Sequence, residues 1–178
     1  MKKLRYFRHS DKKGQFITPA GLERAKRELP IEPYTDGFYG PLIRTAQTLL
    51  AFAEVLNWNL HIHEPIEDVG TEALEAEADT PEFIAAVESG LSNFDAIISV
   101  FPHNIILGWE YTAAVAVIGM FSRMKDRGYG IAVGHDPLIS LAAHYFGWGR
   151  AHSLKTLQYV DFVQSQNGQE ISFVAVGP

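Results

Sequence analysis

Four basic side chains in this sequence stand where a parallel α/β sheet would present them at one edge. Arg8 and His9 end one short apolar segment, Arg44 falls in the first turn of a helical pattern, and His135 ends another apolar segment. In open parallel sheets, ligands bind at the carboxyl ends of the strands, beside the N-terminal ends of the helices that follow. Two guanidinium groups and two imidazoles at one such point predict an anion site, and two fixed guanidinium forks suit a tetrahedral phosphoryl group.

Short apolar segments alternate with helical patterns along the chain, which predicts crossover units, a mostly parallel sheet and helices on both of its faces. The predicted strands occupy 4–8, 36–39, 60–63, 96–100 and 131–134. The C-terminal stretch differs, because two strand-like runs flank Asn167-Gly168, a dipeptide suited to a tight hairpin turn. The predicted fold is an α/β three-layer sandwich with a C-terminal antiparallel hairpin, and the length of 178 residues favours a single domain, 1–178.

Proline is predicted at the first position of four helices, where a missing backbone N–H costs nothing. These helices are TPAGLERAKREL, GPLIRTAQTLLAFAEVL, TPEFIAAVESGL and DPLISLAAHYFG, and a further helix is expected in much of 103–126. In the second of them Leu42, Ala46, Leu49, Ala53 and Leu56 recur at helical spacing. One face of that helix should therefore be buried.

The composition limits the classes of partner. The formal net charge of -6 and the pI near 5.6 argue against a nucleic-acid surface or a polybasic membrane anchor, because both need a positive field. The chain has no cysteine, which excludes a disulfide framework, a thiolate nucleophile and a cysteine zinc site. The sequence shows no apolar run long enough for a signal peptide or a membrane span, so we expect a cytoplasmic protein without membrane or nucleic-acid partners.

Three stretches of the sequence resemble the signatures of the histidine phosphatase superfamily, which includes cofactor-dependent phosphoglycerate mutases and small bacterial phosphohistidine phosphatases. The stretches are RHSDKKGQFITPAGLERAKREL, YGPLIRTAQTL and IAVGHDPLISLAA, in the family's order, and the resemblance extends from residue 4 to about residue 147. The resemblance implies the phosphoglycerate mutase-like fold and a phosphoryl-transfer enzyme that needs no metal and no cofactor. Its partner would be a phosphorylated small molecule or a phosphohistidine protein.

The resemblance also implies roles for individual residues. His9 matches the family's nucleophile, which becomes phosphorylated, and Arg8, Arg44 and His135 match the residues that hold the phosphoryl oxygens. Elementary chemistry agrees with these roles. A neutral imidazole can attack phosphorus in line while the arginines and the second histidine stabilise the equatorial oxygens, and water then hydrolyses the phosphohistidine.

The sequence departs from the family's usual pattern at two places. Ser10 stands where glycine usually follows the nucleophile, and Tyr39 and Gly40 stand where two serines commonly precede the proline of the arginine motif. The Ser10 side chain narrows the turn but can still donate a hydrogen bond. Neither departure removes a charged group, so we expect both to alter the shape of the pocket.

Three carboxyl groups are candidates for the proton donor to the leaving oxygen. The mutase branch of the superfamily has a glutamate after the third strand, where HEPIEDVG offers Glu67 first and Glu64 next. The acid-phosphatase branch has an acid directly after the second histidine, which corresponds to Asp136. Asp136 also precedes a proline at a predicted helix start, where an N-cap role is the alternative. We predict Glu67 as the donor and retain Asp136 and Glu64 as alternatives.

The predicted activity is hydrolysis of a small phosphomonoester or of phosphohistidine. Hydrolysis is favoured over mutase activity because the chain leaves little sequence for the cap elements that a mutase needs. A non-catalytic module that senses a phosphorylated ligand is an alternative from another class. A metal-dependent hydrolase is a third, because His61 and His63 alternate along a predicted strand and point to one face, although no third ligand with convincing spacing accompanies them.

Overall fold

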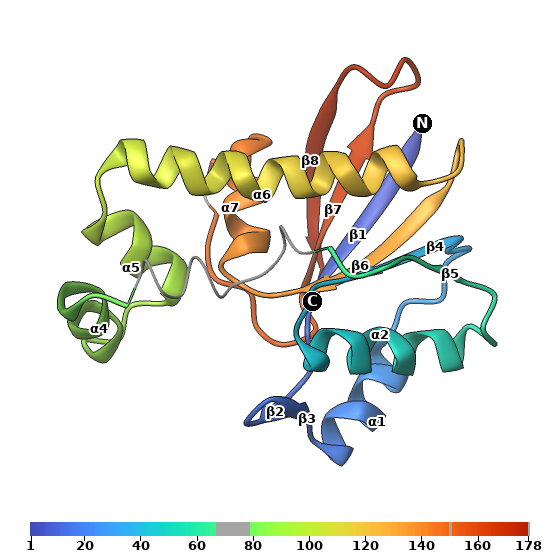
Figure 1. Cartoon of the computed structure of the whole chain (residues 1–178), viewed down its shortest axis with the longest axis horizontal. Coiled ribbons are helices and arrows are strands. Elements are labelled where there is room, and N and C mark those ends of the chain that lie inside the picture. The colour runs from blue at the N-terminus through green and yellow to red at the C-terminus, as the bar shows by residue number, and fades with distance from the viewer. Residues whose placement is uncertain (67–78, 150, 178) are drawn as a thin grey trace.

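The computed structural model describes residues 1–66, 79–149 and 151–177 (Figure 1). Glu67, the predicted proton donor, lies outside the described residues. The elements follow in the order β1 (Lys2–Arg8), β2 (Lys12–Lys13), β3 (Phe16–Ile17), α1 (Pro19–Glu28), β4 (Asp36–Tyr39), α2 (Ile43–Val55), β5 (His61–Ile62), α4 (Pro81–Glu88), α5 (Asn93–Val100), α6 (His103–Arg123), β6 (Tyr129–Gly134), α7 (Leu138–Tyr145), β7 (Tyr159–Gln164) and β8 (Ile171–Gly177).

Six strands form the main sheet, in the order β5-β4-β6-β1-β7-β8. The strands β5, β4, β6 and β1 run parallel, whereas β7 pairs antiparallel with both β1 and β8. The short strands β2 and β3 form a separate hairpin. The predicted α/β sandwich with a mostly parallel sheet and a C-terminal antiparallel hairpin is confirmed.

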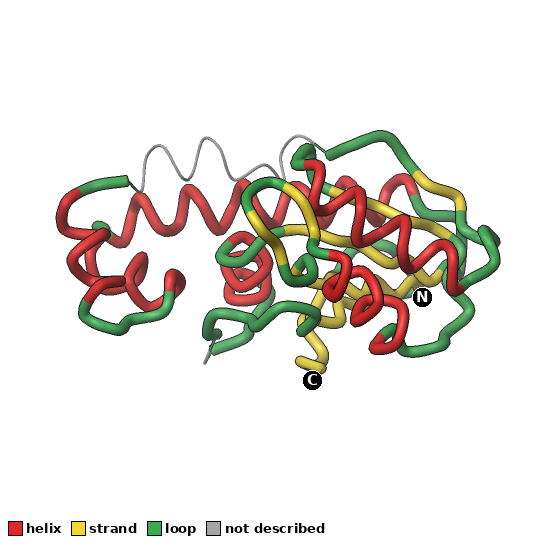
Figure 2. The backbone as a smooth tube through the Cα atoms, turned by 90° about the horizontal axis from the view of Figure 1, so that it is seen from below, coloured by secondary structure: helices red, strands yellow, loops and turns green. Residues whose placement is uncertain are grey.

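Side-chain alternation along the central strands divides the core between the two faces of the sheet. Leu4 and Tyr6 of β1 join the apolar cluster that includes residues of α6 and α7, whereas Phe7 joins the cluster that includes residues of α1 and α2. Along β6, Ala132 belongs to the first cluster and Val133 to the second. Figures 1 and 2 show these helix pairs on opposite sides of the sheet. Strands that are covered on both faces read as continuous apolar runs, which explains why the sequence marks them clearly.

One predicted strand is wrong. Residues 96–100 belong to the helix α5, which Ser92 caps by accepting a hydrogen bond from the backbone N–H of Asp95 at 3.2 Å. Periodicity cannot distinguish a short apolar run in a strand from one in a buried helix. The capping pattern Ser92-x-x-Asp95, directly before the apolar run, was the available signal for a helix. The other four predicted strands are present, although β5 has only two residues.

The prolines mark helix starts less uniformly than predicted. Pro19 and Pro81 occupy the first turn of α1 and α4, as expected. Pro41 and Pro137 precede their helices instead, because α2 begins at Ile43 after an extended residue and α7 begins one residue after Pro137.

The C-terminal turn is also wider than a two-residue turn. Strands β7 and β8 are separated by six residues, within which Gly168 adopts the left-handed conformation with φ 72°.

The helix α6 is long and apolar enough to cross a membrane by length and composition, with a mean hydropathy of 1.5, whereas the sequence analysis found no such run. Half of this apolar stretch is buried within the fold. Val117, Met120 and Phe121 of α6 are all buried in the core, and this burial accounts for much of the composition. A core helix of this kind is weak evidence for a membrane span.

A buried ion pair ties β1 to β7. The Nε and Nη2 atoms of Arg5 donate to the two carboxylate oxygens of Asp161 at 2.8 and 2.9 Å, and its Nη1 donates to the Tyr34 hydroxyl at 3.2 Å. The guanidinium also lies 4.1 Å from the centre of the Tyr159 ring. Arg5 and Asp161 are each 5% exposed, so each is the main compensating charge of the other, and Lys3 Nζ also lies 3.1 Å from Asp161 Oδ2.

We expect Asp161→Ala to lower the free energy of unfolding by about 3 kcal/mol, because it leaves the Arg5 charge buried without its bidentate partner. Urea denaturation of the purified variant measures this loss. The double variant Arg5→Met/Asp161→Leu removes both charges together and should recover most of the lost stability. An Asp161→Ala protein as stable as the parent would show that the ion pair does not hold β7 to β1.

Candidate active site

The carboxyl ends of β1 and β6 bring His9 and His135 together. The two strands are parallel neighbours in which Arg8 lies opposite Gly134, and the backbone N–H of His9 donates to the Gly134 carbonyl at 3.1 Å. The two imidazole ring centres lie 4.8 Å apart, and each histidine is 3% exposed. The structure thus places the two predicted histidines side by side at one edge of the sheet.

Two arginines belong to the same buried region. Arg44 lies in the first turn of α2, the helix that follows β4, and is 7% exposed. Arg8 is the last residue of β1, and its Nη1 donates to the carbonyl of Leu154. The Nε atom of Arg8 is buried and has no hydrogen-bond partner among the described residues. All four residues that the sequence proposed for a phosphoryl site therefore meet where β1, β6 and α2 converge.

The pKa of His9 is lowered to about 4, mainly by burial and further by the neighbouring charges of Arg44, Arg8 and Lys12, while a hydrogen bond to the Ser10 carbonyl acts in the opposite direction. Burial also lowers the pKa of His135, followed by the charge of Arg44. Both imidazoles are therefore neutral near pH 7. The site combines neutral nitrogen atoms with fixed positive charge, which is the electrostatic environment that an anion requires.

Hydrogen bonding sets the tautomer of His9. Its Nδ1 atom lies 2.7 Å from the carbonyl oxygen of Ser10, and a carbonyl can only accept. Nδ1 therefore carries the proton, and Nε2 keeps the lone pair that a nucleophile needs. Both ring nitrogens of His135 are buried without a hydrogen-bond partner among the described residues. Buried polar atoms of this kind can bind the oxygens of a ligand.

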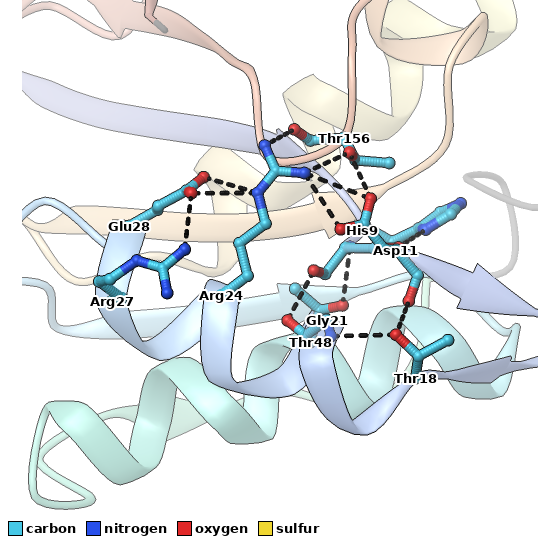
Figure 3. A network of polar contacts seen from close by, with 10 residues as sticks. His9, Asp11, Thr18, Gly21, Arg24, Arg27, Glu28, Thr48 and Thr156 are labelled. Carbon is cyan, nitrogen blue, oxygen red and sulfur yellow. Dashed lines mark hydrogen bonds and ion pairs between the residues drawn. The ribbon is translucent and has the colours of Figure 1, made fainter.

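Ser10, which stands where the family usually has glycine, connects the end of β1 to the helices α1 and α2. Its hydroxyl donates to the carbonyl of Gly21 in α1 at 2.7 Å, and its backbone N–H donates to the Thr48 hydroxyl in α2 at 3.2 Å. The Thr48 hydroxyl in turn donates to the Arg44 carbonyl at 2.9 Å. Figure 3 shows Gly21 and Thr48 within this polar network. The serine thus makes the hydrogen bond that the sequence analysis allowed for, and it links His9 to the turn that carries Arg44.

A second polar group supports the same loop and was not predicted from the sequence. Arg24 Nη1 donates to Asp11 Oδ2 at 3.1 Å and to Thr156 Oγ1 at 3.0 Å, while the Thr156 hydroxyl donates to Asp11 Oδ1 at 2.8 Å. Figure 3 shows these three side chains meeting beside His9. Thr156 is far from Asp11 in the sequence, so no local spacing pattern could indicate the contact.

Asp136 directly follows His135 and is 9% exposed. Its Oδ1 lies 2.5 Å from the Ser140 hydroxyl oxygen, which also lies 2.7 Å from the His152 carbonyl oxygen. The Ser140 hydroxyl donates to Asp136 Oδ1 and also lies within donating distance of the His152 carbonyl, so its single proton faces two acceptors. The N-cap alternative for Asp136 is wrong, because Pro137 is the N-cap of α7 and no side chain caps this helix.

Burial raises the pKa of Asp136, while hydrogen bonds from Ser140, Ser153 and the Leu154 backbone act in the opposite direction, as does the charge of Arg8. A carboxyl group in this environment is more easily kept neutral than an exposed one. Its position next to His135 gives it access to the same buried region. A raised pKa is one property that a general acid needs near neutral pH.

The remaining predicted groups lie elsewhere. Glu64 follows β5, which is separated from β1 by β4 and β6, and three strand spacings put β5 about 14 Å from β1. The His61 and His63 rings do share a face, with centres 4.5 Å apart. His63 Nε2 lies 2.9 Å from Asp36 Oδ1. The part of the chain that the structure describes contains no group of three metal-ligating side chains, so the metal-dependent alternative gains no support.

No protein-family model matches this sequence, and no curated protein is significantly similar to it. Solved structures do match its fold. Phosphoserine phosphatase from Entamoeba histolytica is 14% identical with a TM-score of 0.63, covering 100% of this chain and 98% of its own. Phosphoglycerate mutase from Bacillus anthracis strain Sterne is 14% identical with a TM-score of 0.63, covering 97% and 91%. YhfR from Bacillus stearothermophilus is 13% identical with a TM-score of 0.66, covering 98% and 95%.

These comparisons define the class of fold. The chain has the phosphoglycerate mutase-like fold, and the similarity covers nearly the whole of this chain and of the matched structures. The resemblance seen in the three sequence motifs is thus confirmed at the level of the fold. Since one fold can carry many activities, the activity is argued from the geometry of the site.

The contact between Asp136 and Ser140 predicts the direction in which a mutation shifts a pKa. If neutral Asp136 donates to Ser140, then Ser140→Ala removes a partner of the neutral form and lowers the pKa of Asp136. A serine that donates to the carboxylate would instead stabilise the charged form, and its removal would raise that pKa. Titration of the Asp136 carboxyl carbon by ¹³C NMR separates the two cases. Because Ser140 donates to Asp136, we expect the upward shift, and a downward shift would contradict the assigned donor; Ser89→Ala, an exposed control, should change nothing.

Proposed function

We propose that this protein is a metal-independent phosphatase of the histidine phosphatase type, which hydrolyses a small phosphomonoester or phosphohistidine through a covalent phosphohistidine on His9. The observation that supports this most strongly is the convergence of two neutral imidazoles and two guanidinium groups at the ends of β1 and β6. We also propose that the protein is soluble and cytoplasmic, since burial of half of the apolar stretch of α6 accounts for its composition.

In the first chemical step, Nε2 of His9 attacks phosphorus as the bond to the leaving oxygen breaks. Nδ1 keeps its proton and donates it in a hydrogen bond to the Ser10 carbonyl. This bond orients the ring and stabilises the positive charge that develops on the imidazole. Arg8, Arg44 and His135 stabilise the charge on the equatorial oxygens. Water then cleaves the phosphorus–nitrogen bond and releases phosphate.

We propose Asp136 as the acid that protonates the leaving oxygen. Its carboxyl directly follows His135 and is buried, and this burial raises its pKa and so favours the protonated form. After giving up that proton, the carboxylate can accept one from the attacking water in the second step, which restores the starting state. Glu67, the donor first predicted from the sequence, is the competing assignment that mutation can test.

The covalent step predicts a detectable intermediate. Rapid-quench incubation with phosphoramidate or an aryl phosphate should yield an acid-labile, base-stable phosphoryl group on His9, located by intact mass and peptide mapping. His9→Ala should give neither adduct nor turnover, whereas His103→Ala, which changes an exposed histidine, should keep both. Phosphate binding without adduct and without turnover in the parent protein would favour a phosphoryl-sensing module instead.

The identity of the acid predicts a dependence on the leaving group. Asp136→Asn should reduce kcat for alkyl phosphates by about 100-fold but for aryl phosphates with good leaving groups by less than about tenfold, because only the poor leaving group needs the proton. Steady-state kinetics over a leaving-group series measures the difference. Glu67→Gln is the matched variant. If it shows the selective loss and Asp136→Asn does not, the acid is Glu67.

A further inference from the structure

A hollow of about 250 Å³ lies beside the start of α5 and does not include the four residues of the phosphoryl site. Asp95 of α5 and His144 of α7 line it, together with the apolar side chains of Phe94, Ile98 and Ala151. The hollow therefore combines one carboxylate and one imidazole with apolar walls. None of these residues has a part in the proposed phosphoryl chemistry.

A buried carboxylate stands behind the imidazole of this hollow. Glu110 of α6 is 4% exposed, and its Oε1 lies 2.6 Å from His144 Nδ1. A carboxylate that accepts the Nδ1 proton leaves the lone pair of the neutral imidazole on Nε2. His144 then presents a hydrogen-bond acceptor, and Glu110 adds negative charge behind it. Both features favour a ligand group that donates hydrogen bonds and carries positive charge.

The charge of the surrounding sequence has the same sign. Residues 45–122 contain twelve of the 21 Asp and Glu residues and none of the 15 Lys and Arg residues of the chain. This range includes α4, α5 and nearly all of α6, and Figures 1 and 2 show α4 and α5 together at one end of the molecule. Of these acids, Glu82, Glu88, Asp95 and Glu110 lie on α4, α5 and α6 among the described residues. Carboxylates on these helices raise the local concentration of cationic ligands.

The hollow is connected to the proposed proton donor. The backbone N–H of Phe94 donates to the Ser153 hydroxyl oxygen at 3.0 Å, and the Ser153 side chain is hydrogen-bonded to Asp136. Two hydrogen bonds in series put the start of α5 about 6 Å from the Asp136 carboxyl group. The acid must contact the leaving oxygen, so the leaving group points to the Asp136 side of the site, where α5 begins.

We propose that this hollow is a subsite for a primary ammonium group on the leaving alcohol of the substrate. The proposal rests on the proposed function, with Asp136 as the acid. The ammonium protons match the Asp95 carboxylate and the Nε2 atom of His144, and the apolar walls match a methylene linker. The substrate class is therefore an aminoalkyl phosphomonoester whose positive charge lies several bonds from the ester oxygen.

A series of ω-aminoalkyl phosphates of increasing chain length tests the subsite, with alkyl phosphates and ω-carboxyalkyl phosphates of equal length for comparison. At one chain length, kcat/KM for the amine should exceed that for the alkyl ester by about tenfold, because charge-assisted hydrogen bonds form only with the amine. The carboxylate ester should be the poorest of the three. Added salt should reduce the difference, since it screens the charges.

Asp95→Asn and His144→Phe should each lower the ratio of kcat/KM for amine over alkyl ester several-fold. Asp126→Asn, which changes a fully exposed carboxylate outside the hollow, is the matched control and should leave the ratio unchanged. Equal kcat/KM for the amine and alkyl esters at every chain length would overturn the subsite, as would an unchanged ratio in Asp95→Asn. If no ester is hydrolysed and no phosphohistidine forms, the proposed function itself fails; turnover through His9 without preference for the amine overturns the subsite alone.

Discussion

The parallel pairing of β1 with β6 is the constraint on which the candidate site depends. Because Arg8 lies opposite Gly134, the residues that follow the two strands leave the sheet at the same level. The imidazoles of His9 and His135 therefore lie next to each other. Gly134 itself is required by close packing, since a Cβ atom there would overlap the Tyr6 side chain beneath it. A shift of this register by one residue would send His9 to the other face of the sheet. The two apolar clusters that cover both faces hold the register in place.

Burial at the ends of these strands acts on the charges of the site in two ways. It keeps the imidazoles neutral, which leaves His9 with a usable lone pair at neutral pH. It also excludes water from guanidinium groups that remain charged, so their attraction for a phosphoryl dianion is strong. The same low-polarity environment favours the neutral form of Asp136. Burial thus suits all three proposed roles, those of the nucleophile, the anion cradle and the acid, and no sequence pattern identifies the acid.

The sequence was informative where a local rule connects residue type to position, and uninformative where contacts join distant residues. The strands that are covered on both faces appear in the sequence as apolar runs. The rule that ligands bind at strand ends predicted that His9 and His135 lie at one edge of the sheet. Residues 96–100 were wrongly predicted to form a strand, because their composition suits both a strand and a buried helix. The contact of Ser140 with the His152 carbonyl depends on how the loop after α7 folds back, so no spacing could reveal it. From the sequence alone Glu110 would be placed at the surface, but the packing of α7 against α6 buries it.

The net charge of -6 conceals two regions of opposite character. All 15 Lys and Arg residues, including Arg8 and Arg44 of the phosphoryl cradle, lie outside 45–122, which carries only negative charge. The cradle can hold a dianion because its own arginines, and not the net charge, dominate at short range. Beyond a Debye length the two regions are screened from each other in physiological salt. Under the two proposals above, the phosphoryl group would meet the arginines and the far end of the leaving group would meet the carboxylates, so a molecule with a negative phosphate and a positive tail would match both ends.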